Sequence, residues 1–477
     1  MQVPKHRAFI LMSLLLVLSL LLAACPAPAA TAPAAADAPA EAAAAEAPTA
    51  APEAAAESVT LTVATVNNPD MKVMEGMTDK FEAEHPNIHL EWVVLPENEL
   101  RARVTTDTAT GAASFDVVTV GTFEVPIWGK NGWISSIDSL SSQYPDSMQP
   151  NYGMDDLLPA VKDGLSNDGT LYALPFYGES SFTMYNKAMF DAAGLEMPEQ
   201  PTWEQIREFA CAIHDPANGK YGIVVRGLPG WGQVMAPLTT VVNTFGGRWF
   251  DMDWNPQLTS PEWVEAVTFY RDLMADCGAP GVTGIGFTEA LNLMSQGQAA
   301  MWVDATVAAG FLANSDVGPD MAYALAPVGP VAKGNAWLWS WSLAVPTTSD
   351  HQAAALQFIT WATSRDYIEL VAAQNGWAGV PPGTRKSTYE RAEYLAAAPF
   401  ASLVLKSMLG ADPTDSTRDE VPYTGVQFVA IPEFQGIGTD VSQYIAEALS
   451  GRTSVEEALE KAQKSTLEAM QDAGYIK

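Results

Sequence analysis

The sequence predicts an α/β protein with mostly parallel sheets flanked by helices and with two lobes. Residues 59–66 alternate and are rich in β-branched side chains, as in a strand; a helix that stops before Pro86 follows, and residues 88–95 form a second strand. A strand–helix–strand order requires a crossover connection, which is typical of a parallel sheet. The length of 477 residues predicts the second lobe, because chains beyond about 250–300 residues divide into more than one core.

Acidic residues outnumber basic ones, with 56 Asp and Glu against 25 Lys and Arg, which gives a net charge of −31. Such a charge repels phosphate backbones and anionic lipid surfaces. The composition therefore argues against a nucleic-acid partner. A hydrophobic content of 48% and a charged content of 17% fit a globular body.

The N-terminus has the pattern of an export signal. Residues 1–24 combine a basic start with an apolar stretch, residues 8–22, that is short for a membrane span. The run Leu22-Ala-Ala-Cys25 resembles a bacterial lipobox, which implies cleavage before Cys25 and lipidation of its thiol. The alternative is an ordinary signal peptide with an incidental cysteine.

The segment 25–58 begins with Cys25, and its residues 26–58 are mostly Ala, Pro and acidic residues without Lys or Arg. Such a composition cannot bury a core, and the spread prolines favour an extended chain. We therefore expect a flexible tether that separates the folded body from a membrane.

Polar residues follow two of the predicted strands. Asn67 and Asn68 come after the first strand, and Thr122 comes after a buried strand that includes residues 116–120. Ligands of open α/β sheets bind beyond the carboxyl ends of the strands, so these residues are candidates for one rim of a binding site. The alternative for each residue is that it only stabilises the turn after its strand and contacts no ligand.

Three tryptophans alternate along a later predicted strand, residues 337–345. Trp337, Trp339 and Trp341 fall on one face because side chains of a strand alternate between faces. Three such side chains are bulky for an ordinary core face. Stacking of one or two of them on a ligand is one interpretation, and packing between layers of the protein is the other.

The run Glu179-Ser-Ser-Phe-Thr-Met-Tyr-Asn-Lys187, with Thr202-Trp-Glu-Gln205 downstream, resembles the extracellular solute-binding proteins of carbohydrate ABC importers. Longer runs resemble the sorbitol- and mannitol-binding branch of that family. They are residues 176–182, 226–232, 243–251, 301–311, 337–341, 376–377, 380–385 and 431–435. These runs occur in order over nearly all of residues 59–477.

The resemblance implies a two-lobed periplasmic-binding-protein fold of type II. Lobe one would comprise residues 59–173 and 328–374, and lobe two residues 174–327 and 375–477. The chain would cross the hinge three times, which suits closure around a ligand.

Cys211 and Cys277 fall near the ends of predicted helices in lobe two. An exported protein sits where disulfides persist. A bond between them and two separate buried thiols both remain open.

The resemblance also implies ligand contacts. Glu179 and Asp304 would accept hydrogen bonds from ligand hydroxyls, and Arg226 would donate them. Asn67 and Asn375 could do both. Trp231, Trp339 and Trp377, together with Trp337, would pack against C–H faces.

Two of these contacts have alternatives. Arg226 could instead form an ion pair with a carboxylate of its own lobe. Trp231 could be a loop anchor.

We therefore expect a lipid-anchored receptor on the extracytoplasmic face of the cell membrane. It would capture a sugar alcohol and deliver it to ABC permease subunits, as a monomer without cofactor, metal or catalytic residues. The nearest alternative is the same receptor for a cyclic mono- or oligosaccharide. Other classes are a surface sensor and a secreted glycan hydrolase, although the sequence carries no G-x-S-x-G or H-E-x-x-H motif.

Overall fold

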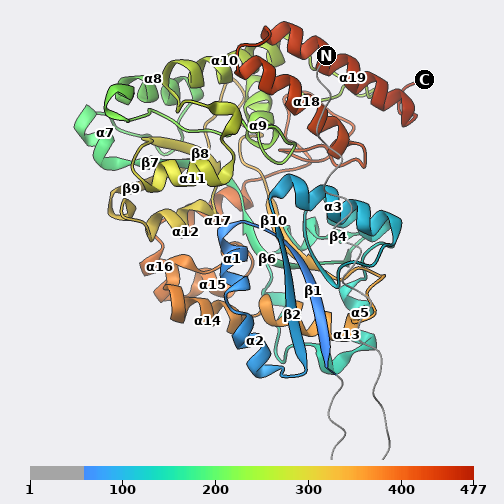
Figure 1. Cartoon of the computed structure of the whole chain (residues 1–477). Coiled ribbons are helices and arrows are strands. Elements are labelled where there is room, and N and C mark those ends of the chain that lie inside the picture. The colour runs from blue at the N-terminus through green and yellow to red at the C-terminus, as the bar shows by residue number, and fades with distance from the viewer. Residues whose placement is uncertain (1–57) are drawn as a thin grey trace, which may run out of the picture. The chain divides into compact units, whose positions relative to one another are not determined.

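The strands of the computed structural model, which describes residues 58–477, form three sheets (Figure 1). The strands are β1 Val59–Val66, β2 Ile88–Leu95, β3 Val117–Gly121, β4 Ser166–Asn167, β5 Thr170–Leu171, β6 Leu174–Glu179, β7 Ser181–Asn186, β8 Met301–Ala305, β9 Met321–Leu325 and β10 Trp339–Ala344. The five-stranded sheet has the order β2-β1-β3-β10-β6, and the three-stranded sheet has the order β8-β7-β9. Strands β4 and β5 form a separate pair.

The five-stranded sheet contains the predicted parallel start. Strand β1 runs parallel to both β2 and β3. Strand β10 runs antiparallel to β3 and to β6, so two distant segments complete the sheet. The sheet is therefore mixed at the side where β10 and β6 join it. In the three-stranded sheet β7 runs antiparallel to both β8 and β9, so the prediction of mostly parallel sheets is wrong for its named strands.

Helices connect and cover these strands. They are α1 Pro69–Glu75, α2 Thr78–Glu84, α3 Glu97–Thr110, α4 Glu124–Lys130, α5 Ile137–Gln143, α6 Pro159–Gly164, α7 Lys187–Ala193, α8 Trp203–Ile213, α9 Met235–Phe245, α10 Pro261–Cys277, α11 Phe287–Ser295, α12 Ala308–Ala313, α13 Gln352–Ala362, α14 Arg365–Asn375, α15 Lys386–Glu390, α16 Ala392–Ala397, α17 Ala401–Leu409, α18 Phe434–Leu449 and α19 Val455–Asp472. In Figure 1, α2, α3, α5 and α13 lie around the five-stranded sheet, and α8, α10, α18 and α19 lie on the side of the three-stranded sheet. No helix of residues 58–477 is long and apolar enough to cross a membrane.

The predictions for the N-terminal segment lie outside the described residues. The signal peptide of residues 1–24, the lipidated Cys25 and all of the tether except its last residue belong to this part of the chain. They stay predictions from the sequence.

The chain passes from one sheet to the other at Ser180, the single residue between β6 and β7. We expected lobe two to begin at residue 174, and this boundary is wrong for β6. The strand pairs with β10 in the five-stranded sheet, with Trp339 opposite Glu179. All residues of β6 are buried, as expected for a strand of the five-stranded sheet.

The segment around Arg385 also departs from the predicted boundaries. We expected it in lobe two, but its side chain is fully buried against residues expected in lobe one. Its guanidinium donates to the carbonyl oxygens of Tyr152 at 2.9 Å and Thr363 at 2.9 Å, and to the carboxylate of Asp156 at 3.3 Å. A buried guanidinium requires such partners. The other lobe boundaries stay a prediction.

Asp70 on α1 is a buried carboxyl group between separate parts of the fold. It is only 4% exposed and borders a small cavity with Val307, Phe311 and Phe400. Among the described residues, no group forms a hydrogen bond with its Oδ2 atom. Burial raises the pKa of Asp70 to about 8, although a hydrogen bond from its own backbone opposes the shift.

This burial predicts a dependence of stability on pH. The unfolded chain releases the Asp70 proton near its ordinary pKa of about 3.9, and the folded chain releases it near 8. The free energy of unfolding therefore falls as pH rises through this interval. Asp70→Asn should reduce that fall, as measured by urea unfolding at pH 5, 6.5 and 8.

Asp79→Asn, at an exposed position on α2, is the matched control and should leave the pH dependence of wild type unchanged. Parallel curves for Asp70→Asn and wild type would contradict the assignment.

Candidate functional site

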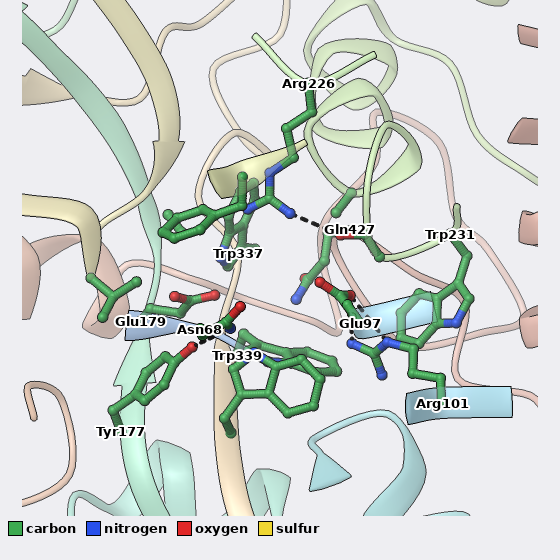
Figure 2. A pocket seen from close by; sticks show the side chains of 16 residues that line it. Asn68, Glu97, Arg101, Tyr177, Glu179, Arg226, Trp231, Trp337, Trp339 and Gln427 are labelled. Carbon is green, nitrogen blue, oxygen red and sulfur yellow. Dashed lines mark hydrogen bonds and ion pairs between the residues drawn. The ribbon is translucent and has the colours of Figure 1, made fainter. Parts of the chain in front are cut away.

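A cavity lies where the five-stranded sheet meets the chain around the three-stranded sheet (Figure 2). Several of its lining residues end a strand of the five-stranded sheet or follow one. The cavity encloses about 470 Å³ of empty space, counting the part that is open to solvent. Its polar lining comprises Asn68, Glu97, Arg101, Tyr177, Glu179, Arg226 and Gln427. Its aromatic lining comprises Trp231, Phe287, Trp337, Trp339 and Trp341.

Glu179 brings a carboxyl group without a protein donor to this cavity. It ends β6, is 6% exposed, and receives no hydrogen bond to its side chain from any described residue. Burial raises the pKa of Glu179 well above its ordinary value; Arg226 opposes the shift, and Asp304 and Glu97 add to it. A buried carboxyl group that lacks a protein donor is stabilised by a ligand hydroxyl that donates a hydrogen bond to it.

Arg226 presents its guanidinium to the cavity while bound to Asp304. Its Nε donates to Oδ2 of Asp304 at 2.8 Å, and its Nη2 donates to Oδ1 at 2.5 Å. The third nitrogen donates to the carbonyl oxygen of Gly232 at 2.9 Å. The alternative of an ion pair within the same lobe is therefore present, and Arg226 still lines the cavity.

Asp304 does not line the cavity, contrary to our expectation that it accepts from a ligand. It is fully buried and also accepts from Nε1 of Trp302 at 2.9 Å and from the amide of Ala305 at 2.6 Å. Its oxygens are thus occupied by protein donors. Its role in this structure is to orient Arg226.

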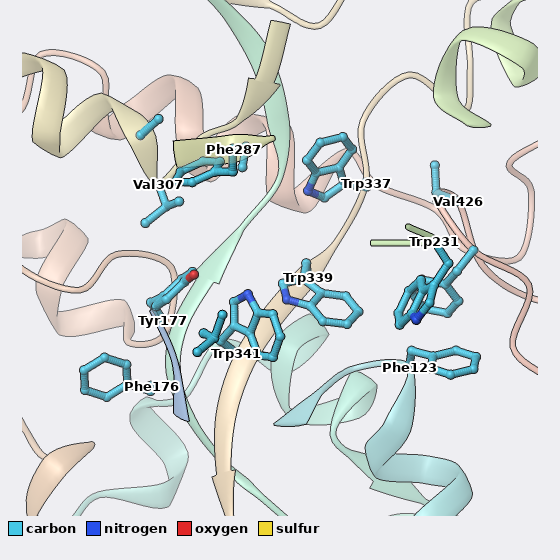
Figure 3. Packing of buried hydrophobic residues seen from close by; sticks show 14 of the residues in the cluster. Phe123, Phe176, Tyr177, Trp231, Phe287, Val307, Trp337, Trp339, Trp341 and Val426 are labelled. Carbon is cyan, nitrogen blue, oxygen red and sulfur yellow. The ribbon is translucent and has the colours of Figure 1, made fainter. Parts of the chain in front are cut away.

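Four tryptophans line the cavity, and Trp231, Trp339 and Trp341 lie close to one another (Figure 3). Trp339 lies 5.9 Å from Trp231 and 5.4 Å from Trp341 between ring centroids. Trp337 lines the cavity as well. Alternation along β10 explains why Trp339 and Trp341 share a face, and the loop before α9 supplies Trp231.

Glu97 and Arg101 form a charged part of the lining that the sequence analysis missed. Both lie in the first turns of α3, directly after β2. Nε and Nη2 of Arg101 lie 3.1 and 3.0 Å from Oε1 of Glu97, and Nη1 binds Glu124. Their position after the carboxyl end of a strand, with a spacing of four residues, was the available signal.

The start of α3 also contacts the loop before α9. Asn98 donates to the carbonyl oxygen of Pro229 at 3.0 Å, and Gln233 donates to Oε2 of Glu97 at 3.0 Å. A Cβ atom at Gly232 would lie 2.1 Å from Oε1 of Glu97. The absence of a side chain at Gly232 therefore permits this close approach between the expected lobes.

Asn68, rather than Asn67, reaches the cavity. Asn67 is exposed, whereas Asn68 precedes α1 and its Nδ2 donates to the hydroxyl of Tyr177 at 2.9 Å. Tyr177 on β6 was not predicted as a site residue, although it lies in the run that carried the family resemblance.

Three other predicted residues lie away from the cavity lining. Thr122 faces α6, where a Cβ atom at Gly164 would lie 3.1 Å from its methyl group. Asn375 is exposed at the end of α14. Trp377 is covered by Arg391, whose guanidinium carbon lies 4.7 Å from the ring centroid.

The arrangement can bind a polar molecule that carries several hydroxyl groups. It places an acceptor, a fixed guanidinium and flat aromatic faces around one cavity. Within residues 58–477, no group of three or more His, Cys, Asp or Glu residues is placed to hold a metal ion.

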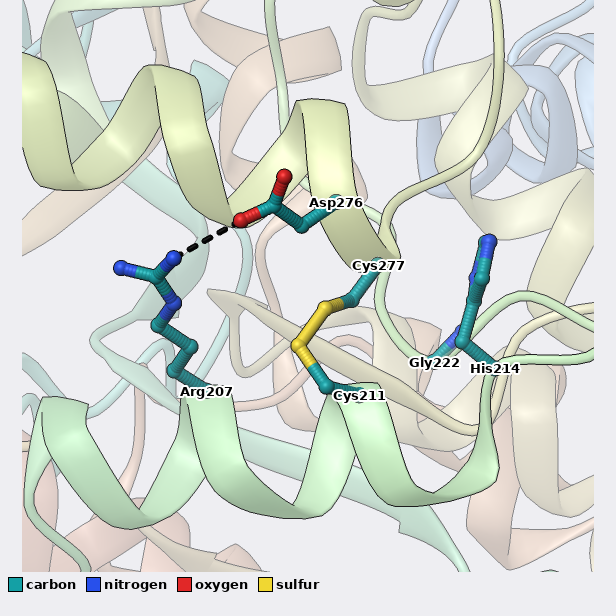
Figure 4. Close-up of a disulfide and its surroundings, with 6 residues drawn as sticks. All are labelled: Arg207, Cys211, His214, Gly222, Asp276 and Cys277. Carbon is teal, nitrogen blue, oxygen red and sulfur yellow. Dashed lines mark hydrogen bonds and ion pairs between the residues drawn. A yellow bond between two sulfur atoms is a disulfide. The ribbon is translucent and has the colours of Figure 1, made fainter.

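A disulfide joins two helices on the side of the three-stranded sheet (Figure 4). Cys211 and Cys277 are bonded, with their Cα atoms 4.9 Å apart, so the bond links α8 to α10. This decides between the two interpretations left open by the sequence. Helix α10 also carries Tyr270, whose hydroxyl donates to the carbonyl oxygen of Arg226 at 2.7 Å.

Removal of this disulfide should destabilise the protein. The bond joins residues 66 positions apart, and loss of a native disulfide typically costs about 2–5 kcal/mol. We expect Cys211→Ala/Cys277→Ala to lower the free energy of unfolding measured in urea. Reducing agent should lower that of wild type and leave the double variant unchanged; an insensitive wild type would contradict the bond.

Comparison with known proteins places this site in a family. Residues 65–369 match the family described as "Bacterial extracellular solute-binding protein". The chain is 49% identical over 421 residues to the mannitol-binding protein of Pseudomonas aeruginosa, an alignment that covers 88% of this chain and 94% of that protein.

Solved structures show the same fold. An ABC transporter solute-binding protein of Agrobacterium vitis S4 with bound D-mannitol has a TM-score of 0.85 and 51% identity, and the match covers 88% of this chain and 100% of that chain. One from Agrobacterium radiobacter K84 in complex with ribitol has a TM-score of 0.75 and 24% identity, covering 86% and 99%.

These likenesses confirm the predicted two-lobed α/β fold and the predicted resemblance to solute-binding proteins. The prediction of a binding protein rather than an enzyme is confirmed by the same relatives. The chain belongs to the bacterial extracellular solute-binding protein family.

Proposed function

We propose that this protein is the substrate-binding receptor of an ABC importer and that it captures a linear sugar alcohol of the mannitol type. The observation that carries the proposal is the buried Glu179 carboxyl group, which faces the cavity without a donor from the described residues. Every carbon of a linear polyol bears a hydroxyl that both donates and accepts. Such a ligand satisfies Glu179 and can accept from Arg226 at the same time.

The relatives support this ligand class over ring sugars. The relative from Pseudomonas aeruginosa that is named for mannitol aligns over 94% of its length, and the structure with bound D-mannitol is 51% identical to this chain. A receptor for a cyclic mono- or oligosaccharide is the second candidate. The tryptophans of the cavity are the feature that favours it, because flat aromatic faces also suit sugar rings.

The proposed cellular setting rests on the sequence of the first 58 residues. Lipidation at Cys25 would anchor the protein on the extracytoplasmic face of the membrane, and residues 26–58 would let the folded body reach the permease. The receptor would act as a monomer, with the permease subunits as its protein partners.

A titration of the chain from residue 26 onward tests the ligand class. Mannitol, sorbitol, arabitol and ribitol would be compared with glucose and maltose by calorimetry and thermal unfolding. A ligand at about 100 times its Kd adds about 2.7 kcal/mol to the free energy of unfolding. We expect stabilisation by at least one linear polyol and none by ring sugars; stabilisation by ring sugars alone would overturn the proposal.

Glu179→Gln tests the group that carries the proposal. The amide of Gln replaces an acceptor oxygen and leaves a buried hydroxyl of the ligand without its acceptor, which costs about 1–3 kcal/mol, so we expect the Kd for the polyol to rise about 10- to 100-fold. Glu208→Gln, at an exposed position on α8, is the matched control. Equal affinities in Glu179→Gln and wild type would remove Glu179 from the site.

Gly232→Ala tests whether binding needs the approach of the loop to α3. The added Cβ would meet Oε1 of Glu97 at 2.1 Å, and Glu97 cannot move freely because Arg101 and Gln233 hold it. We expect at least a tenfold weaker polyol affinity by calorimetry. Gly284→Ala, which meets no atom within 4 Å, should bind as wild type does; an unchanged Kd for Gly232→Ala would contradict the expectation.

A further inference from the structure

We propose that Arg101 is a specificity-determining residue that makes the cavity select an extended, acyclic polyol over a ring sugar. It does so by covering the tryptophan faces against which a ring would stack. The inference rests on the proposed function and names the residue responsible for its ligand class.

The guanidinium of Arg101 occupies the centre of the aromatic group. Its carbon lies 4.2 Å from the ring centroid of Trp231, 4.6 Å from that of Trp341 and 5.0 Å from that of Trp339. All three distances are within the range of about 6 Å for a cation–π contact. Figure 2 shows Arg101 beside Trp231 and close to Glu97 at one side of the cavity. Three of the tryptophans that line the cavity are thus engaged by one cation.

Carboxylates fix this position from the other side. Arg101 pairs with Glu97 and with Glu124, and it is only 7% exposed. Glu124 also accepts from the amide of Gly121 at 3.0 Å, and Glu97 accepts from Gln233 at 3.0 Å. Displacing Arg101 would leave two buried carboxylates without their cation. A ligand therefore meets Arg101 as a rigid part of the wall.

The shape of the ligand decides how it meets such a wall. A pyranose ring is bound well by a bare aromatic face because one side of the ring is an apolar C–H surface. Against a guanidinium the same C–H surface shields the N–H donors of the guanidinium from water and offers them no acceptor. An acyclic polyol has hydroxyls along its whole length, so it can turn acceptors toward Arg101 at any point.

The test compares two affinities within each variant. Calorimetry would give the Kd values of mannitol and glucose for wild type, for Arg101→Ala/Glu124→Gln and for Arg101→Lys. Glu124→Gln removes one of the two carboxylates that the first change would strand, and the other, Glu97, keeps its hydrogen bond from Gln233. Arg101→Lys keeps the charge and lacks the flat guanidinium. Arg103→Ala, at an exposed position on the same helix, is the matched control.

We expect the ratio of the glucose Kd to the mannitol Kd to fall at least tenfold in Arg101→Ala/Glu124→Gln and by a smaller factor in Arg101→Lys. Arg103→Ala should keep the ratio of wild type. Circular dichroism and thermal unfolding would establish that each variant folds. If the double variant does not fold, the ratio in Arg101→Lys decides alone.

A folded variant with an unchanged ratio would overturn the proposal, and so would a wild type that binds glucose as tightly as mannitol with Arg101 in place. A wild type that binds neither ligand would contradict the proposed polyol function instead. In that case glucose binding gained by the Arg101 variants would support the role of Arg101, and its absence would overturn it.

Discussion

The cavity depends on one constraint, that each buried charge needs a partner of opposite sign. Arg101 satisfies it with Glu97 and Glu124, and Arg226 satisfies it with Asp304. Breaking such a pair costs about 3–5 kcal/mol because an uncompensated charge remains buried. Each guanidinium group is thereby held in its own part of the wall before a ligand binds.

Glu179 is the member of this charged group that the protein leaves without a donor among its described residues. Its carboxyl group is buried near Arg226, Asp304 and Glu97, and burial raises its pKa more than Arg226 lowers it. The protein thus supplies the desolvation and leaves the hydrogen bonds to the ligand. A neutral ligand rich in hydroxyl groups fits this division, because it donates to Glu179 without bringing a further charge.

The sequence predicted what depends on local periodicity and missed what depends on distant pairing. Alternation placed Trp339 and Trp341 on one face correctly, since a strand fixes that relation by itself, whereas Trp337 lies before the strand. The partner of Asp304 is a residue 78 positions away, so no local pattern could distinguish a ligand contact from an ion pair. The boundary at residue 174 failed for the same reason, because β6 is paired by the distant strand β10.

The same residues line the cavity and join the two sides of the fold. Glu97 binds Arg101 in the wall and accepts from Gln233 of the opposite loop, while Gly232 accepts from Arg226 and lies against Glu97. A ligand shifts a conformational equilibrium only by its different affinity for the two states. Any separation of α3 from this loop would take Glu97 and Arg226 apart, and a ligand that touches both would lose contacts. Ligand recognition and contact between the two sides are therefore coupled through shared atoms.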